Sequence, residues 1–541
     1  MANQSKILVD IPADKGVHLK SAGQKGEKYV YKYTRYFRNA SGEPRNEAKL
    51  IGKLDADSGR MIPNQNYYKM FNVTPETPDL SVWNYGLTYL IRKSGQDMGL
   101  LDCLQKTFGA QTEEILALAS FIIRENQAMA MAMDSLDGFQ ERNLLPELDK
   151  PLTSQSCSRL FKSINSTKTH NFFKRWAKVT LNKDTVCYDI TSVSSYSKYI
   201  TDVENGYNRD HEDLPQLNLG MFCCETSNLP LYYIRYNGSI TDKSNLSYVL
   251  PNASSVGIKN VKLILDGGFI NEECFVHLNK LCKTFTIGIP SHLDISKEMI
   301  KENIDNITSF TNKLFWQEMF CVQKPTSIHG ISGKLMLFFD PQSHLRLCSE
   351  LSERIERLAS ELLALKQYPV SKLKEYSKYF IITKNDEDNG FTFRVDNDAV
   401  DQLRRVKGFF LLFSTDMTAT PGDSLYYYRT KDSYEKLFDQ IEVDLGGGRI
   451  RAHDPRATEG KVFVTFIALA IRAYMLGKLK KYLIANSSSL NNALNKLESV
   501  IVIKSKGEYS FAKALTKQQK EILEPFNAVE DIKSKVNSCL R

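Results

Sequence analysis

The pattern of apolar and polar positions changes character several times along the chain. From residue 29 to about residue 66, aromatic and basic positions alternate between turn signals, which predicts a β-rich module within residues 1–75. Later the apolar positions recur with the helical period, as in TEEILALASFIIRENQ, and a Thr/Ser cap opens a further stretch. We therefore expect a helical region over residues 76–180.

A run of strand-like segments begins near residue 184. DTVCYDITSV, LPQLNLGMFCCET and LPLYYIRY are three consecutive strand candidates, and Ser227-Asn228 between the last two is a hairpin signal. A helix (DKSNLSYVLPNA), an apolar strand (VKLILD), a second helix and the strand TFTIGIP follow. The order β-β-β-α-β-α-β is the topology of the ribonuclease-H-like fold.

This regular order ends near residue 290. Helical stretches then surround the strand-like pieces GKLMLFFD and GFTFRV, and another buried strand, GFFLLFST, follows only at residues 408–415. We therefore predict an α/β fold in which a ribonuclease-H-like mixed-sheet core, over residues 181–290 and 406–541, is interrupted by an insertion domain over 291–405. We also expect helices at the C-terminal end of the core.

Length and composition agree with several domains in one chain. The chain has 541 residues, whereas single cores stop growing at roughly 250–300. Its ten cysteines form no CxxC pair, which favours reduced thiols and no zinc site in a cytoplasmic protein. The start has no secretion signal, and the apolar run 462–477 contains Arg472 and is too short to span a bilayer, so we expect a buried core helix and no membrane partner.

The charge balance slightly favours a polyanionic partner. The formal net charge is +8, which suits nucleic acid but is also common in proteins that do not bind it. The basic and aromatic mixture of residues 29–66 suits contact with a DNA backbone, although ordinary exposed strands share it. The helical region 76–180 is equally compatible with a DNA-binding unit and with a plain helical bundle.

Two aspartates occupy unusual positions in the predicted core. Asp189 interrupts an apolar strand, where a charge is costly unless a group such as a divalent cation compensates it. Asp266 ends the strand VKLILD directly before Gly267-Gly268, at the sheet edge where ligands gather in α/β folds. Capping of the following helix is the alternative role for Asp266.

A third carboxylate, Glu435, lies in the predicted helix LYYYRTKDSYEKLFDQIEVDL. Its spacing from Tyr428 and Lys431 places the three side chains on one helix face, and an exposed pair of Lys431 with Glu435 is the alternative. Carboxylates in the order strand, strand, helix match the oxygen ligands that two Mg²⁺ ions need. Such a set activates a water or a 3′-hydroxyl for in-line attack on a phosphodiester.

Several linked segments resemble one family. VCYDITSVSSYS, LILDGGFINEE and YYYRTKDSYEKLFDQI are similar to bacterial insertion-sequence transposases of the DDE class, in the group with a Tyr-x2-Arg-x3-Glu-x6-Lys signature and an insertion before the glutamate. By position, Asp189, Asp266 and Glu435 match the catalytic, metal-binding triad of that family. The resemblance implies two Mg²⁺ or Mn²⁺ ions, cleavage at terminal inverted repeats, often through a hairpin, and joining to target DNA. It also implies a homodimer on paired ends, in the bacterial cytoplasm and at the nucleoid when bound to DNA.

The chain departs from the signature at two positions. Tyr428 matches the signature tyrosine, but Lys431 replaces the arginine, which keeps the charge and loses bidentate phosphate geometry. Glu442 stands where the signature has lysine, which reverses the charge. Four basic residues beyond the signature are further candidates for DNA contact, with plain surface charge as the alternative: Arg449, Arg451, Arg456 and Lys461.

The leading interpretation is a transposase that cuts and joins double-stranded DNA. A metal nuclease of the same fold that only hydrolyses DNA is one alternative, and the extended motif from Tyr428 to Arg472 argues against it. A catalytically silent or domesticated DNA-binding descendant is the other alternative. Glu442 favours this descendant, whereas the complete set of three carboxylates opposes it.

Overall fold

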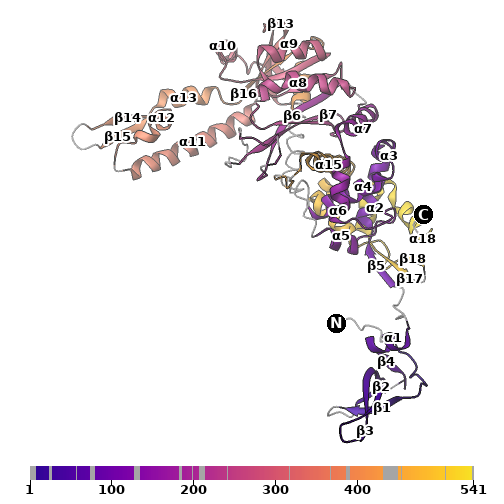
Figure 1. Ribbon diagram of the computed structural model, residues 1–541. Coiled ribbons are helices and arrows are strands. Elements are labelled where there is room, and N and C mark those ends of the chain that lie inside the picture. Colours follow the sequence, from indigo (N-terminus) through magenta and orange to yellow (C-terminus); the bar gives the residue numbers. More distant parts are fainter. Residues whose placement is uncertain are drawn as a thin grey trace. The chain divides into compact units, whose positions relative to one another are not determined.

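The computed structural model defines the architecture of most of the chain (Figure 1). It describes residues 8–22, 27–56, 58–73, 80–126, 135–181, 185–197, 199–200, 202–205, 214–240, 242–315, 317–365, 367–385, 390–429, 449–452, 454–505 and 507–538. The chain divides into two compact units. The first comprises Met1–Val82, Val502–Ala512 and Arg541, and the second comprises Trp83–Ile501 and Lys513–Leu540.

The first unit is built on a four-stranded antiparallel sheet. In spatial order its strands are β1 (Val17–Ala22), β2 (Glu27–Arg38), β3 (Pro44–Leu54) and β4 (Met61–Pro63). Helix α1 (Gln65–Phe71) begins after Asn64, whose side chain accepts hydrogen bonds from two amides of the first turn. A small core of buried residues lies between helix and sheet: Val30, Ile51, Met61 and Tyr67. The β-rich character predicted for residues 29–66 is therefore found.

Helices form much of the second unit. The segment predicted to be helical contains α2 (Gly86–Asp97), α3 (Leu100–Phe108), α4 (Gln111–Glu125), α5 (Leu136–Arg142), α6 (Ser154–Ser163) and α7 (Ser166–Thr180). The C-terminal helices are α15 (Pro455–Ala485), α16 (Leu490–Leu497), α17 (Lys517–Leu523) and α18 (Ala528–Asn537). A small sheet of order β18-β17-β5 is formed by β5 (Leu80–Asn84), β17 (Ile501–Ser505) and β18 (Glu508–Phe511), most of whose residues belong to the first unit.

Helix α15 is the central helix of this group and packs against α2, α4 and α6. Its close approach to α6 depends on Gly460, because a Cβ atom there would lie 2.4 Å from the Cα of Phe161. By length and composition α15 could cross a membrane, but 78% of its most apolar window is buried inside the protein. Arg472 is 1% exposed. The core helix predicted for residues 462–477 is thus confirmed.

A nine-stranded mixed sheet forms the centre of the second unit. Its spatial order is β11-β12-β13-β16-β10-β9-β6-β7-β8. The strands expected from the sequence are β6 (Thr185–Ser194), β7 (Gln216–Cys224), β8 (Pro230–Asn237), β9 (Lys262–Leu265), β10 (Thr284–Ile289) and β16 (Phe409–Ser414). Helix α8 (Asp242–Ser255) connects β8 to β9, and helix α9 (Glu272–Leu281) connects β9 to the parallel strand β10. The order β-β-β-α-β-α-β is therefore found.

The segment predicted as an insertion contributes both to this sheet and to a separate small core. Strands β11 (Lys313–Leu314), β12 (Met319–Ile328) and β13 (Ile331–Phe339) extend the sheet beyond β16. The remaining elements are α10 (Asp294–Asn303), α11 (Pro341–Ala364), α12 (Leu373–Tyr376), β14 (Phe380–Lys384), β15 (Phe391–Val395) and α13 (Asn397–Arg405). Leucines of α11 pack on Tyr376, Tyr379 and Phe380, so this part has its own core.

Candidate active site

Two of the predicted site residues lie side by side on the central sheet. The parallel strands β6 and β9 pair Cys187 with Ile264, and continuing that register by two residues sets Asp189 opposite Asp266. Residues two apart on a strand share a face, and neighbouring strands are about 4.8 Å apart. The structure therefore brings these two carboxylates together on one face, where the carboxyl end of β9 meets the middle of β6.

Asp189 is held inside the sheet. Its residue is 8% exposed, and one carboxylate oxygen accepts a hydrogen bond of 2.9 Å from the backbone amide of Ile190. On its other side, the antiparallel strand β7 places Met221 opposite Asp189. A carboxylate so buried is stable only where donors or cations balance its charge, which agrees with the reasoning that singled it out.

Asp266 does not act as the helix cap that the sequence allowed as an alternative. Its backbone is extended, and its side chain makes no capping hydrogen bond to the short 3₁₀ turn that follows. The amide at the start of α9 is capped instead by Asn271, whose side chain accepts a hydrogen bond from Cys274. The Asp266 carboxylate accepts a hydrogen bond of 3.3 Å from the hydroxyl of Tyr428.

Tyr428 reaches Asp266 because a glycine leaves room for its ring. The register that pairs β9 with β10 sets Gly288 beside Asp266, and Gly288 also pairs with Leu412 of β16. A Cβ atom on Gly288 would lie 2.4 Å from the Tyr428 hydroxyl oxygen. The helical residues 421–429 pack on the same face through the buried Leu425, which joins Leu412 in one apolar cluster. Gly288 has no side chain, and the Tyr428 ring occupies the space that this leaves between Asp266 and Leu412.

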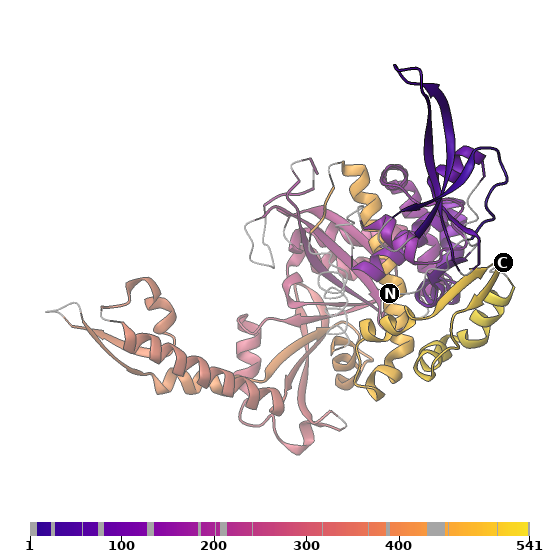
Figure 2. The same ribbon diagram turned by 90° about the horizontal axis from the view of Figure 1, so that it is seen from below.

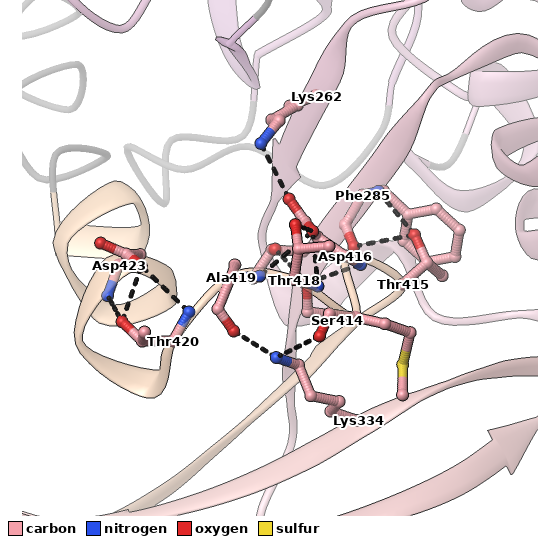
Figure 3. Close-up of polar contacts among 12 residues, drawn as sticks. Lys262, Phe285, Lys334, Ser414, Thr415, Asp416, Thr418, Ala419, Thr420 and Asp423 are labelled. Atoms are coloured by element: carbon pink, nitrogen blue, oxygen red, sulfur yellow. Dashed lines mark hydrogen bonds and ion pairs between the residues drawn. The ribbon is translucent and has the colours of Figure 1, made fainter.

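The loop that leads into this helical segment is fixed by Asp416 (Figure 3). Its carboxylate accepts hydrogen bonds from Thr418 and from the amide of Ala419, and it forms an ion pair of 2.8 Å with Lys262 of β9. Burial raises the pKa of Asp416, but the hydrogen bonds from Lys262 and Thr418 outweigh burial and hold that pKa well below its usual range. On the other side of the loop, Lys334 of β13 donates to the carbonyls of Met417 and Ala419.

Asp423 completes this anchoring at the start of the helical segment. It accepts hydrogen bonds from the amide and the hydroxyl of Thr420, and these bonds lower the pKa of its carboxyl group. The sequence reasoning missed Asp416, Lys262 and Lys334. A signal existed for Asp416, since an aspartate two residues before a threonine is typical of an Asx turn.

The four basic candidates beyond the signature differ in their surroundings. Arg449 pairs with Ser194 at the end of β6, and its guanidinium lies 5.1 Å from the ring centre of Tyr196. The carbonyl of Arg451 accepts a hydrogen bond from Lys461. Burial, with the nearby charge of Arg451, lowers the pKa of Lys461 to about 8.

Arg456 is largely occupied within the protein. It forms an ion pair of 3.3 Å with Asp454, the residue that caps α15, and this contact lowers the pKa of the Asp454 carboxyl group. Arg449, Arg451 and Arg456 are all exposed, whereas Lys461 is partly buried. Contact of any of the four with DNA stays a prediction.

Three of the predicted positions, Lys431, Glu435 and Glu442, lie outside the described residues. In the part of the chain that the structure describes, no group of three or more His, Cys, Asp or Glu side chains forms a metal site. The described site therefore consists of two carboxylates, Asp189 and Asp266, with Tyr428 bonded to the second. Their role as metal ligands stays a prediction.

Comparison with known proteins gives little further guidance. No protein-family model matches the chain, and no curated protein matches it. Among solved structures, the chain is similar to a piggyBac transposase in a synaptic complex with hairpin DNA, with a TM-score of 0.34 and 10% sequence identity. The alignment covers 84% of this chain and 83% of that one. At this TM-score the likeness carries no argument about the site.

Proposed function

We propose that this chain is a DNA transposase of the DDE class, which cleaves the ends of an insertion sequence and joins them to target DNA. The observation that carries the proposal is the parallel register of β6 and β9, which, continued by two residues, sets Asp189 opposite Asp266, together with the hydrogen bond from the Tyr428 hydroxyl to Asp266. The proposal includes a homodimer acting on paired ends in the bacterial cytoplasm, which rests on the sequence resemblance alone.

The strand arrangement supports a ribonuclease-H-like core. Five consecutive strands of the sheet have the spatial order β8-β7-β6-β9-β10. The first three strands in the sequence pair antiparallel, and the next two add in parallel on the other side of β6. This is the arrangement that the sequence order β-β-β-α-β-α-β was expected to give.

The donor set fits a pair of hard divalent cations such as Mg²⁺ or Mn²⁺. Asp189 and Asp266 supply carboxylate oxygens, the preferred ligands of such cations, and Glu435 is proposed as the third ligand. Glu435 follows Tyr428 by two helical turns, so its spacing favours the same helix face. When bound, the ions supply activation of water or a 3′-hydroxyl and neutralise charge on the phosphodiester.

The residues of the chain prepare this site in three ways. The buried strand β6 fixes the position of Asp189, because every residue of that strand is buried. The Tyr428 hydroxyl orients the Asp266 carboxylate, as hydrogen-bonding groups around a metal site commonly do. Arg449, which pairs with Ser194 at the end of β6, and Arg451 are both exposed, and we propose that they contact the DNA backbone.

The test is Mg²⁺-dependent cleavage of a duplex that carries the DNA flanking the coding region on both sides. Wild type is compared with Asp189→Asn and Asp266→Asn, and Asp294→Asn, whose side chain is 89% exposed, serves as the control. We expect nicking by wild type and by the control, and at least about a thousandfold loss in the two site variants, as for removal of catalytic groups that act as a unit. Binding without cleavage by wild type would instead identify a silent DNA-binding descendant.

A further inference from the structure

A two-stranded ribbon extends from the sheet of the first unit. β1 pairs with β2 only as far as Lys32, and β4 pairs with β3 only from Gly52 onwards. Between these limits β2 and β3 pair with each other, from Tyr33 with Ala48 to Arg38 with Pro44. We call residues 33–49 the ribbon. Figure 2 shows it as the long indigo strand pair.

The ribbon is exposed on both faces. Every residue of 34–38 and of 40–49 is exposed, including the large apolar side chains Tyr36 (68%) and Phe37 (39%). A two-stranded ribbon without a covering layer is at best marginally stable in water. Large aromatic side chains held exposed on such a ribbon indicate a surface that a partner covers.

The charge of the ribbon is complementary to an anion. It contains four basic and two acidic residues. Arg45 and Glu43 form an exposed ion pair of 3.3 Å, which contributes little. Within the described residues, Arg35, Arg38 and Lys49 form no ion pair with an acidic side chain, so their charges are available to a partner.

The ribbon is also held in one shape before any partner binds. At its tip, the Asn39 side chain accepts hydrogen bonds from the amides of Ser41 and Glu43. Along one face, His18 stacks on Tyr33 at 4.3 Å between ring centres, and Tyr33 contacts Tyr36 at 5.3 Å. A preformed surface loses less conformational entropy on binding.

We propose that the ribbon enters the major groove of duplex DNA and serves as a recognition element for the element ends. The major groove is about 12 Å wide and accepts a two-stranded β-ribbon. In that groove one face of the ribbon meets the base edges and the phosphates flank its two edges, so its excess of basic side chains favours DNA over an uncharged protein surface. Arg35, Arg38 and Lys49 then contact phosphates. This proposal rests on the proposed transposase function and names the segment that binds its substrate.

The test compares a triple variant of the ribbon, Arg35→Ala, Arg38→Ala and Lys49→Ala, with a matched control of equal charge change. The control is Lys513→Ala, Lys517→Ala and Lys520→Ala, three exposed lysines at and before α17. The probe is the duplex flanking the coding region, and binding is measured over a range of salt concentrations. Each phosphate contact contributes about 0.9 to the slope of log K against log salt. We therefore expect the ribbon variant to lower the slope by about 2–3 and the affinity at least tenfold, and the control to change neither.

A second variant removes the ribbon as a whole. Residues 34–47 are replaced by Asn-Gly, which joins Tyr33 to Ala48 through a tight turn and leaves the core around Val30 intact. Thermal unfolding checks that the shortened chain is folded, and we expect it to lose preference for the flanking duplex over a scrambled one. Wild-type affinity and slope in both ribbon variants, or equal losses in the lysine control, would overturn the ribbon proposal alone. Failure of wild type to bind any duplex would overturn the transposase proposal itself.

Discussion

The hydroxyl of Tyr428 donates a hydrogen bond of 3.3 Å to the carboxylate of Asp266, although 162 residues separate the two in the chain. Glu435 follows Tyr428 by seven residues in the sequence. One direct contact therefore links the strand carboxylates to the segment from which the third proposed ligand comes.

Gly288→Ala is predicted to disconnect Tyr428 from Asp266. The added methyl group would lie 2.4 Å from the Tyr428 hydroxyl oxygen, so the ring must move away. We expect at least about a tenfold loss of Mg²⁺-dependent end cleavage, since small displacements at a site are costly. Gly268→Ala is the control, because its Cβ would meet nothing within 4 Å. Equal activity of the two variants would show that the contact is unimportant.

Tyr428→Phe is predicted to weaken metal use while leaving the fold unchanged. The ring still fills the space above Gly288, but the bond that orients Asp266 is lost. Loss of such a supporting bond costs about 10–100-fold in metal affinity or activity. We expect the Mg²⁺ concentration for half-maximal cleavage to rise by about that factor. The exposed neighbour Tyr426→Phe should keep the wild-type Mg²⁺ dependence, and an unchanged midpoint in Tyr428→Phe would refute this role.

Asp416→Asn is predicted to destabilise the protein in a pH-dependent way. The folded-state pKa of Asp416 lies below its ordinary value of 3.8, so its contribution to stability is present above that value and is lost as pH falls through the folded pKa. Removing the charge leaves Lys262 without its ion pair, at a cost of about 1–3 kcal/mol near neutral pH.

Chemical denaturation at pH 7 and at about pH 3 measures this effect, since at the lower pH the carboxylate is protonated in the unfolded chain but still ionised in the folded one. The difference in unfolding free energy between wild type and Asp416→Asn should shrink at the lower pH. Asp294→Asn, whose side chain is 89% exposed, is the control and should change the unfolding free energy little at either pH. A difference that is the same at both pH values would contradict the assigned role of Asp416.

The core of the fold was predictable because its signals are local. Apolar runs, turn residues and helical periods gave the strands around Asp189 and Asp266 and the helices between them. Strand β12 was not expected, since it contains Pro325 and its second half is the polar run QKPTS. Among the helical stretches expected after residue 290, the first is α10, which ends at Asn303, and a short 3₁₀ turn and β11 follow.

The supporting residues of the site were not predictable, because their partners are distant in the sequence. Gly288 matters only once β9 and β10 pair in register and Tyr428 lies above them. Asp416 and Lys262 are 154 residues apart, and they meet because β16 inserts between β13 and β10. Such pairings follow from the three-dimensional assembly of strands and leave no local pattern.

The most direct test of the account is the role of Glu435, compared with a matched carboxylate on the same segment. Wild type, Glu435→Gln and Asp439→Asn are incubated with Mg²⁺ and the duplex flanking the coding region, and both end binding and strand cleavage are measured. The account predicts that Glu435→Gln binds the ends but does not cleave them, whereas Asp439→Asn does both. Cleavage by Glu435→Gln at the wild-type rate would contradict the claim that Asp189, Asp266 and Glu435 form one catalytic site.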